Sequence, residues 1–357
     1  MTTPSRLVVR APNWLGDAVM ALPALGAVRA AFPDARIAIA AATSIAPLFE
    51  EDTAAAQDEL ISLGAADERA AAGAHRAADA HGATDRHGRP RNEVVALADG
   101  KFDASLLLPN SFRAAWTART AGIPERWGYA ANFRGWLLTR AITRPKARHL
   151  HQSEYYRELV RGLGLDAPES LPRLSVRPET AHRADSLLVR NGVDGSAAIV
   201  GFAPGAAYGH AKRWPPRRVA EVVTRVTKEL GRVCVLVGAQ ADGDAGREIE
   251  SSLPADVRPV NLIGRTDLRL LAGVLARCGA FVSNDSGAMH LAAAVGVPVV
   301  AIFGPTDDRV TAPLGEHDVL TRQVFCRPCM LRDCPIDHRC MKGIAIETVF
   351  SAVAGRL

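Results

Sequence analysis

Four polar or small residues late in the chain, Asn284-Asp285-Ser286-Gly287, have types and spacing that suit anion binding. They follow an apolar run at 280–283 that predicts a buried strand, and they precede an Ala-rich run that predicts a helix carrying His290. The first backbone N–H groups of such a helix are unpaired, and with the helix dipole they form a seat for an anion, most often phosphate. The alternative is that Asp285 and Ser286 only cap the helix, a common role of both residue types.

A loop of complementary composition surrounds Lys212. Residues 204–215 read PGAAYGHAKRWP and follow an apolar run at 197–202 that predicts another strand. Glycines such as Gly205 let backbone N–H groups approach phosphate oxygens, and a lysine supplies a compact positive charge. The Walker pattern GxxxxGK[ST] is missing, so ATP hydrolysis is not implied. These residues predict a diphosphate site built from the Lys212 loop and the helix start at Ser286-Gly287.

A carboxylate near the N-terminus is the candidate general base. The strand predicted at 6–9 runs into a helix predicted from Gly16-Asp17 to Val28, and in open parallel sheets ligands bind beyond the carboxyl ends of the strands, where Asp17 falls. The turn reads NWLGDA and not GxGxxG, which argues against a dehydrogenase. Asp17 could deprotonate a hydroxyl that displaces a diphosphate leaving group. The alternative is a carboxylate that only stabilises the helix N-terminus through the dipole.

Alternating strands and helices must position these loops. At 357 residues the chain suits about two domains, and its rhythm of apolar strands and amphipathic helices restarts after a Pro-spaced linker at 167–178. We therefore predict an α/β protein of two Rossmann-like, doubly wound parallel-sheet domains facing a central cleft, at 1–176 and 177–357. Residues 65–93 have no side chain of larger apolar area than Ala, which predicts a mobile insertion in the first domain.

The cysteines have a spacing typical of metal sites. Cys326-x2-Cys329-x4-Cys334-x5-Cys340 encloses His338 in a Cys-rich segment at 326–340. Stable disulfides are uncommon in a cytoplasmic protein, so a zinc or iron–sulfur centre and a compact loop of reduced thiols both remain open.

Charge and composition limit the class of partner. A net charge of +5 and a pI of about 9.0 fit an anionic substrate or membrane surface, while the common nucleic-acid-binding signatures are missing. No apolar run approaches the roughly 20 residues that span a bilayer, and no signal peptide is recognisable, so we expect a soluble, cytoplasmic protein.

One stretch of the first domain alternates arginines with aromatic residues, which suits carboxylates, phosphates and the interfacial zone of a membrane. The alternative places the aromatics in the core and the arginines on a solvated face. The residues are Arg113, Trp116, Arg119, Arg126, Trp127, Phe133, Arg134, Trp136 and Arg140.

Several motifs together resemble the lipopolysaccharide heptosyltransferases of glycosyltransferase family nine, and the resemblance covers nearly the whole chain. They are NWLGDAVMALPAL, LLLPNSFRAA, AGIPERWGY, HQSEYY, PGAAYGHAKRWP and SNDSGAMHLAAAVGVPVVAIFGPTD. The resemblance implies a GT-B fold, an ADP-heptose donor in the C-terminal domain and a Kdo-lipid A core acceptor in the N-terminal domain. It also implies an inverting transfer without a cofactor or an essential protein-bound metal, carried out by a monomer that is peripheral at the cytoplasmic face of the inner membrane.

The resemblance also assigns roles by position. Asp17 matches the proposed base and Lys212 the diphosphate-binding lysine. The remaining substrate-binding positions are Asn13, Gly16, Gly205, Asp285, Ser286, Gly287 and His290. The implied reaction transfers heptose to the first heptose of the inner core. A family member with a different acceptor and a nucleotide-sugar-binding protein without catalysis are the alternatives, and the segment 65–93 departs from the family pattern.

Overall fold

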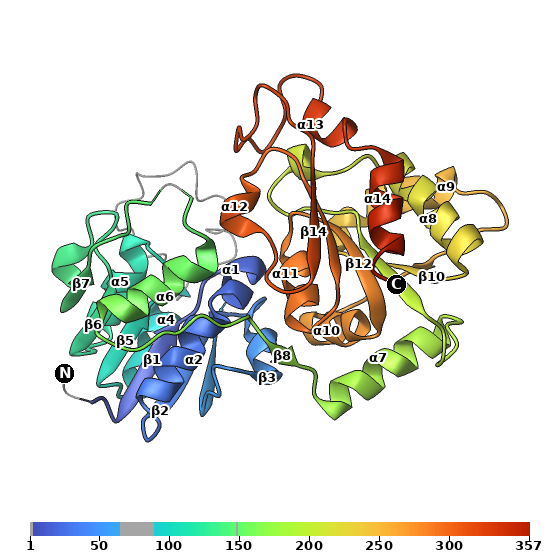
Figure 1. Cartoon of the computed structure of the whole chain (residues 1–357). Coiled ribbons are helices and arrows are strands. Elements are labelled where there is room, and N and C mark those ends of the chain that lie inside the picture. Colours follow the sequence, from blue (N-terminus) through green and yellow to red (C-terminus); the bar gives the residue numbers. More distant parts are fainter. Residues whose placement is uncertain (1–2, 65–88, 148) are drawn as a thin grey trace. The chain divides into compact units, whose positions relative to one another are not determined.

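The computed structural model describes residues 3–64, 89–147 and 149–357. The chain divides into two compact units, Met1–Pro172 and Arg173–Leu357, and each contains its own sheet (Figure 1). Most of the insertion predicted at 65–93 lies outside the described residues. Its end was placed wrongly, because the helix α4 already begins at Arg89 and Glu93 is buried within it, beside Arg10.

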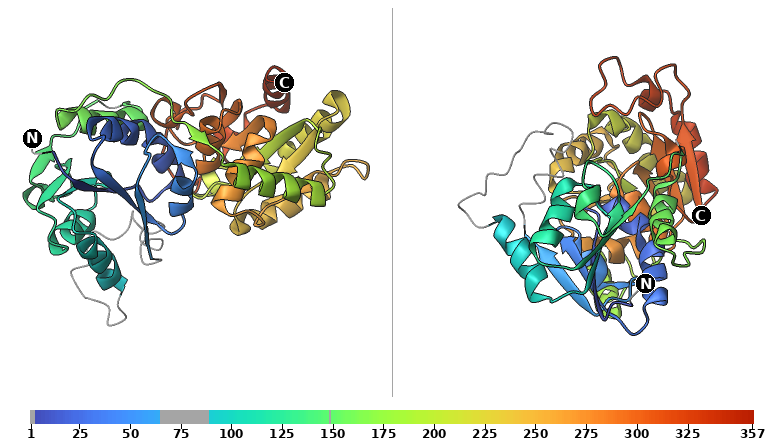
Figure 2. Two further views of the ribbon diagram at one scale, coloured as in Figure 1. Left: turned by 90° about the horizontal axis from the view of Figure 1, so that it is seen from below. Right: turned by 90° about the vertical axis from the view of Figure 1, so that its left-hand side faces the viewer.

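The first unit is built on six parallel strands in the order β4-β2-β1-β5-β6-β7. Val8 at the centre of β1 pairs with Ala38 on one side and Ser105 on the other. Helices cover both faces of this sheet, which is why β1 and β2 read as almost continuous apolar runs (Figure 2). The strands are β1 (Arg6–Arg10), β2 (Arg36–Ala42), β4 (Glu59–Leu63), β5 (Ala104–Leu107), β6 (Glu125–Tyr129) and β7 (Arg140–Ile142), with a short β3 (Asp52–Thr53). The helices are α1 (Leu15–Met20), α2 (Leu22–Ala31), α4 (Arg89–Asp99), α5 (Phe112–Thr120) and α6 (Gln152–Gly162), with short 3₁₀ turns η1 (Ala46–Glu50) and η2 (Gly135–Leu137).

The single helix predicted after β1 is in fact two. The helical run pauses at Ala21 between α1 and α2, and Pro23 lies in the first turn of α2. Proline lacks an N–H and is tolerated at a helix start, so this position favours a new helix there over a continuous one.

The second unit repeats the plan with six parallel strands in the order β11-β10-β9-β12-β13-β14. Its strands are β9 (Ile199–Ala203), β10 (Val233–Leu236), β11 (Val260–Asn261), β12 (Cys278–Asn284), β13 (Val299–Phe303) and β14 (His317–Thr321), with a short β8 (Leu174–Ser175). Its helices are α7 (Pro178–Arg190), α8 (Pro216–Leu230), α9 (Gly243–Ser252), α10 (Leu268–Ala276), α11 (Gly287–Ala294), α12 (Asp308–Thr311), α13 (Arg339–Lys342) and α14 (Ile346–Ala354), with 3₁₀ turns η3 (His210–Lys212) and η4 (Gln240–Asp242).

Helix α8 shows how the apolar pattern builds the second core. Val219, Val222, Val223 and Val226 recur at helical spacing and are buried, and each buried valine contributes roughly 1.5–3 kcal/mol. The helix ends at Gly231, whose φ of 61° is the left-handed conformation that glycine adopts without strain.

Both sheets reverse their strand order beside their first strand, between β1 and β5 and between β9 and β12. Ligands of open α/β sheets bind at this point, beyond the carboxyl ends of the strands. The predicted class of two doubly wound parallel sheets is confirmed, and the loops that follow these four strands are the places to look for chemistry. Among the described residues, no helix is both long and apolar enough to cross a bilayer.

Candidate active site

Lys212 and Asp285 meet at the reversal point of the second sheet, although 73 residues separate them in sequence. Lys212 lies in the loop after β9 and Asp285 directly after β12, and the ammonium donates to Oδ2 of the carboxylate at 2.5 Å. The hydroxyl of Thr306, which follows β13, donates to the same oxygen at 2.7 Å. All three side chains are buried, so the two charges compensate each other away from water.

The capping alternative for Asp285 and Ser286 is wrong. Ser286 stands at the N-cap of α11, but the structure describes no side-chain hydrogen bond that caps this helix. The Ser286 hydroxyl instead shares a hydrogen bond of 3.1 Å with that of Ser283, and Asp285 is committed to Lys212 and Thr306. Neither side chain therefore occupies the first backbone N–H groups of α11.

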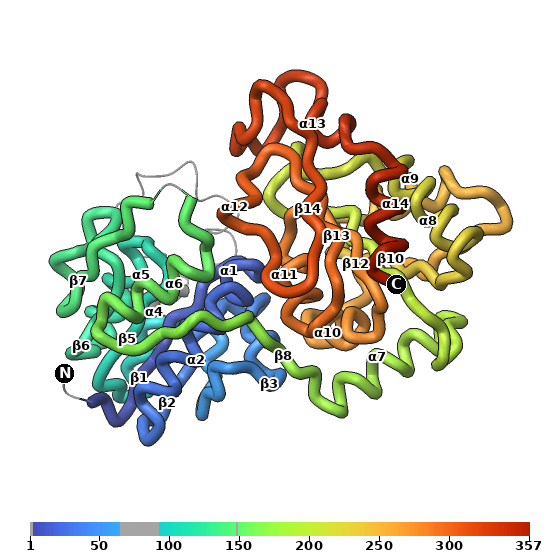
Figure 3. The backbone as a smooth tube through the Cα atoms, in the orientation of Figure 1, coloured from blue at the N-terminus to red at the C-terminus, as the bar shows by residue number. Residues whose placement is uncertain are grey.

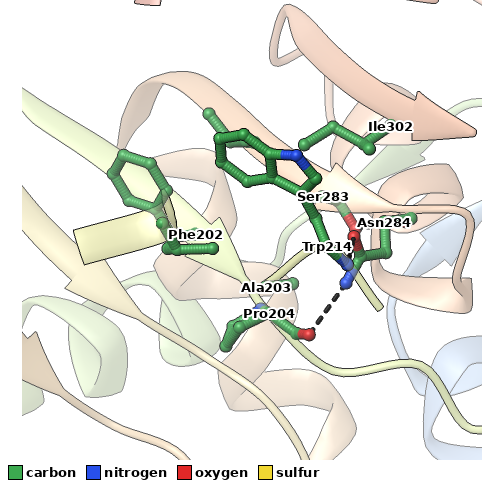
Figure 4. A pocket seen from close by; sticks show the side chains of 9 residues that line it. Phe202, Ala203, Pro204, Trp214, Ser283, Asn284 and Ile302 are labelled. Carbon is green, nitrogen blue, oxygen red and sulfur yellow. Dashed lines mark hydrogen bonds between the residues drawn. The ribbon is translucent and has the colours of Figure 1, made fainter. Parts of the chain in front are cut away.

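Asn284 fastens the loop after β9 to the turn after β12. Its side-chain oxygen accepts from the backbone N–H of Trp214 at 3.1 Å, and its amide donates to the carbonyl of Pro204 at 2.8 Å (Figure 4). Phe202, Ser283 and Ile302 help to line a cavity of about 10 Å³ beside it. A cavity of that volume holds about one water molecule and is too small for a substrate, so these residues have a structural role beside the site.

Gly205, predicted to approach phosphate through its backbone, lies against a carboxylate. A Cβ at this position would stand 2.1 Å from the carboxyl carbon of Asp242. Asp242 in turn accepts from the N–H of Ala239 at 3.1 Å and from Arg213 at 3.3 Å. The need for glycine here is explained by this close approach. Gly287 is the first residue of α11, and His290 is buried in its first turns.

The Cys-rich segment, residues 326–340, contacts the Lys212 loop. The sequence did not suggest this contact. The Tyr208 hydroxyl donates to the carbonyl of Met330 at 2.8 Å, and the N–H of Ala211 donates to that of Arg332 at 2.9 Å. The ring of Tyr208 also lies 4.5 Å from the ammonium of Lys212. The segment is an irregular excursion of the backbone before α13 (Figure 3), and its contacts fix the position of Lys212 from outside the sheet.

The four cysteines of this segment are free thiols, of which Cys340 is buried and the others are half-buried. Burial raises the pKa of Cys340, and the neighbouring thiols of Cys326, Cys329 and Cys334 add to the effect. His338 donates its backbone N–H to Cys334 at 3.3 Å. Across the described ranges, no three His, Cys, Asp or Glu side chains are placed to hold a metal ion.

Asp17 lies in the first turn of α1, at the reversal point of the first sheet. It is half-buried, and the hydroxyl of Tyr156 on α6 donates to its Oδ1 at 3.4 Å. Burial, followed by the charge of Asp17, raises the pKa of Tyr156 well above its ordinary value, so the phenol remains a donor. Sequence reasoning missed Tyr156. The amphipathic pattern around HQSEYY placed it on a helix but gave no sign of which carboxylate it would meet.

Other polar groups gather at the same edge of the first sheet. Gly16 lies in α1 beside Asp17, and Oδ1 of Asn13, after β1, is buried without a hydrogen-bond partner among the described residues. Asn110, after β5, donates through its amide to the Tyr155 hydroxyl at 2.7 Å. Amide, carboxyl and phenol groups at one sheet edge suit recognition of a hydroxylated molecule.

The predicted surface of alternating arginines and aromatics is partly wrong. Arg134 is fully buried and donates to backbone carbonyls, and Trp127 is also in the core. Arg126, on β6, likewise donates to backbone carbonyls, at Ile123 and Leu137. Bulky side chains fill the space under the β6–β7 connection, and the guanidinium groups satisfy the carbonyls that this packing isolates from water.

The alternative, with every aromatic in the core, is wrong as well, because Trp116, Phe133 and Trp136 are exposed. Arg113 pairs with Glu93 at 3.5 Å and Arg140 with Glu125 at 3.8 Å.

Comparison with known proteins identifies the family to which the residues around Lys212 and Asp17 belong. The family model described as glycosyltransferase family 9 (heptosyltransferase) matches residues 94–339. Lipopolysaccharide heptosyltransferase 2 of Salmonella typhimurium strain LT2 is 31% identical over 89% of this chain and 88% of that protein, and its namesake in Escherichia coli K12 is 31% identical over the same shares. The solved structure of E. coli ADP-heptose lps heptosyltransferase II aligns with a TM-score of 0.79 and 27% identity over 98% of both chains.

The family model spans more than half of the chain and includes Lys212, Asp285 and Tyr156. Asp17 lies before its first residue but within a chain that aligns almost end to end with the solved structure. The chain belongs to glycosyltransferase family 9, the heptosyltransferases, and is a glycosyltransferase.

Proposed function

We propose that this enzyme transfers heptose from ADP-heptose to the first heptose of the lipopolysaccharide inner core. Its relatives carry the names lipopolysaccharide heptosyltransferase 2 and ADP-heptose lps heptosyltransferase II. The observation that carries the proposal is the buried Lys212–Asp285 pair at the start of α11, because a diphosphate needs a fixed cation beside a helix N-terminus.

The donor is assigned to the second unit. The diphosphate of ADP-heptose would lie against the first N–H groups of α11, with Lys212 as its cation and Asp285 and Thr306 holding that cation in place. Negative charge grows on the diphosphate as the sugar departs. A lysine already fixed at this position stabilises that charge without having to reorganise.

The acceptor and the base are assigned to the first unit. Asp17 would take the proton of the acceptor hydroxyl, whose oxygen forms a bond to the anomeric carbon of heptose. The bond from that carbon to the diphosphate oxygen breaks, and its electron pair leaves with ADP. Attack on the face opposite the leaving group inverts the anomeric centre. Tyr156, through its hydrogen bond to Oδ1, is a positioning residue for the carboxylate.

Asp17→Asn tests this assignment. We expect kcat to fall by about 10²- to 10⁴-fold, as is typical for loss of a general base, with the affinity for ADP-heptose near that of the wild type. Release of ADP in the presence of purified core acceptor measures the rate. Asp34→Asn, which changes an exposed carboxylate of the same unit, is the matched control and should turn over normally. Wild-type turnover by the Asp17→Asn enzyme would remove Asp17 from the mechanism.

The acceptor is tested separately, with core oligosaccharides that end at Kdo or at the first heptose. Transfer only to the second confirms the proposed acceptor, while transfer to Kdo assigns the enzyme to the preceding step. Binding of ADP-heptose without ADP release on any acceptor would make the protein a nucleotide-sugar-binding module. We further propose that it acts as a monomer, peripheral to the cytoplasmic face of the inner membrane, where a lipid-linked acceptor lies.

A further inference from the structure

Exposed aromatic side chains gather on one part of the first unit. Phe112 and Trp116, on α5, stack with ring centres 6.1 Å apart, and Phe112 lies 6.2 Å from Trp136 of η2. Their exposed fractions are 41%, 49% and 63%. Phe133, three residues before Trp136, is 95% exposed. Exposed aromatic rings that touch one another, as those of Phe112, Trp116 and Trp136 do, are unusual on a protein surface and mark an interaction site.

The backbone that carries these side chains is held firmly. Arg134 is buried and donates to the carbonyls of Tyr129 at 3.0 Å and Ser111 at 3.3 Å, so it ties the loop after β6 to the residue that precedes α5. Asn132 and Phe133 have φ angles of 49° and 57°, in a left-handed region that a bulky side chain such as phenylalanine rarely adopts. The hydrogen bonds of Arg134 thus hold Phe133 exposed to solvent in a strained backbone conformation, which favours a functional role for its exposed side chain.

Positive charge is concentrated in the same stretch of chain. Residues 104–150 contain eight Lys or Arg residues and one acidic residue, Glu125, a net charge of +7, whereas the whole chain carries +5. The remainder of the chain is therefore at −2. Helix α5 has no acidic residue, and its Arg119 is exposed with its guanidinium 5.7 Å from the ring centre of Trp136.

We propose that Phe112, Trp116, Phe133 and Trp136, with Arg119 at their edge, form a docking surface for an anionic lipid bilayer. Tryptophan and phenylalanine settle at the boundary between headgroups and acyl chains, and arginine pairs with lipid phosphates. Charge complementarity selects an anionic bilayer over a protein partner, because α5 has no acidic residue and its exposed Arg119 lies at the edge of the aromatics. The proposal deepens the peripheral location proposed above, but it needs neither donor nor acceptor.

Sedimentation of the full-length enzyme with vesicles tests the proposal. The vesicles contain either phosphatidylcholine alone or equal parts of phosphatidylcholine and phosphatidylglycerol, without any lipopolysaccharide. We expect binding to the anionic vesicles, weakened about tenfold or more when Phe112, Trp116 and Trp136 are all replaced by Ser. Arg119→Gln should weaken binding by about fivefold at low salt and by less as salt is raised.

Phe325→Ser is the matched control. Phe325 belongs to the second unit, is 80% exposed and has Arg339 5.1 Å from its ring centre, so it reproduces an exposed aromatic beside an arginine. Its replacement should leave vesicle binding unchanged. Circular dichroism and transfer to an acceptor in detergent solution should be normal for every variant.

Three results would overturn the proposal. One is equal binding by the triple variant and the wild type, and another is an equal loss in Phe325→Ser. The third is wild-type protein that ignores both kinds of vesicle, which would assign the surface to a protein partner. Because the vesicles carry no acceptor, these outcomes are independent of whether heptose is transferred.

Discussion

Lys212 of the second unit and Arg134 of the first are both buried cations, and the sequence suggested a ligand-binding role for each. Their surroundings differ. Lys212 has a carboxylate partner, Asp285, and the face of the Tyr208 ring. Arg134 donates to backbone carbonyls, including those of Tyr129 and Leu107. A buried cation that pairs with a carboxylate at the ends of parallel strands can interact with a ligand. A buried cation that donates its N–H groups to backbone carbonyls stabilises the fold instead.

The chemistry of the two side chains fits this division. Lysine is a point charge on a flexible stem, which suits a diphosphate whose charge changes during the reaction. Arginine presents five donors in a planar fork, which can satisfy several carbonyls at once. Burial lowers the pKa of Arg134 to about 10, so it remains charged at neutral pH inside the first unit.

Of the two cations, Lys212 of the second unit should give the larger effect on catalysis when it is removed. Lys212→Ala should lower kcat by about 10²- to 10³-fold, the usual loss for one group that stabilises developing charge, and should weaken donor binding. Lys212→Arg should recover binding better than rate, since the fork places its charge elsewhere. Steady-state kinetics and ADP-heptose titration measure both.

Lys228→Ala, which removes an exposed lysine paired with Asp256, is the control and should behave as the wild type. If Lys212→Ala bound ADP-heptose as tightly as the wild type, the contrast between the two cations would fail.

Removing the cation of the first unit should affect stability and leave chemistry alone. Arg134→Met removes the donor to the carbonyls of Tyr129, Ser111 and Leu107, so we expect a loss of about 3 kcal/mol in the free energy of unfolding. Urea unfolding measures this loss. Activity per folded molecule should stay near that of the wild type. Arg119→Met, at an exposed position, should change stability by less than about 0.5 kcal/mol. A stable Arg134→Met enzyme with poor acceptor kinetics would return Arg134 to the site.

The sequence predicted the frame of both sites because that frame depends on local patterns. Apolar runs fix the strands, and the restart of the rhythm after the proline-rich linker predicts two parallel sheets. Parallel strands bring their following loops to one edge, which was enough to predict that Lys212 and the turn at Asp285 would meet. The strand β6, with Glu125, Arg126 and a glycine, and the short β7 were missed because their polar residues conceal a buried position in the sheet.

Contacts between distant segments could not be predicted in this way. Thr306 and Tyr156 reach Asp285 and Asp17 from other elements, and nothing local in FGPTD or HQSEYY specifies those partners. The burial of Arg134 was hidden for a related reason. An arginine that serves carbonyls inside a fold and one that faces solvent occur in the same composition, and only the packing of Trp127 and its neighbours distinguishes them.

The smallest expected effect is that of Tyr129→Phe, which tests whether water is excluded from the surroundings of Arg134. Tyr129, whose carbonyl accepts from Arg134, is buried, and its hydroxyl donates to the carbonyl of Tyr155 at 2.7 Å. Burial raises the pKa of the Tyr129 phenol, with Tyr155 adding to the effect. Tyr129→Phe should therefore cost about 1 kcal/mol at neutral pH, the usual net value of one hydrogen bond.

The stability deficit of Tyr129→Phe relative to the wild type should shrink as the pH rises. Above about pH 10 a tyrosine of the unfolded chain ionises, while Tyr129 in the folded protein keeps its proton. The native state then binds more protons than the unfolded state, so the wild type loses stability by up to about 1.4 kcal/mol per pH unit, and the Tyr129→Phe variant does not share this loss. Urea unfolding of both proteins should show the deficit of the variant shrinking above about pH 10 and closing about one unit higher. A deficit that stayed constant across this range would mean that water reaches Tyr129, and the sealed surroundings that make Arg134 a structural cation would have to be abandoned.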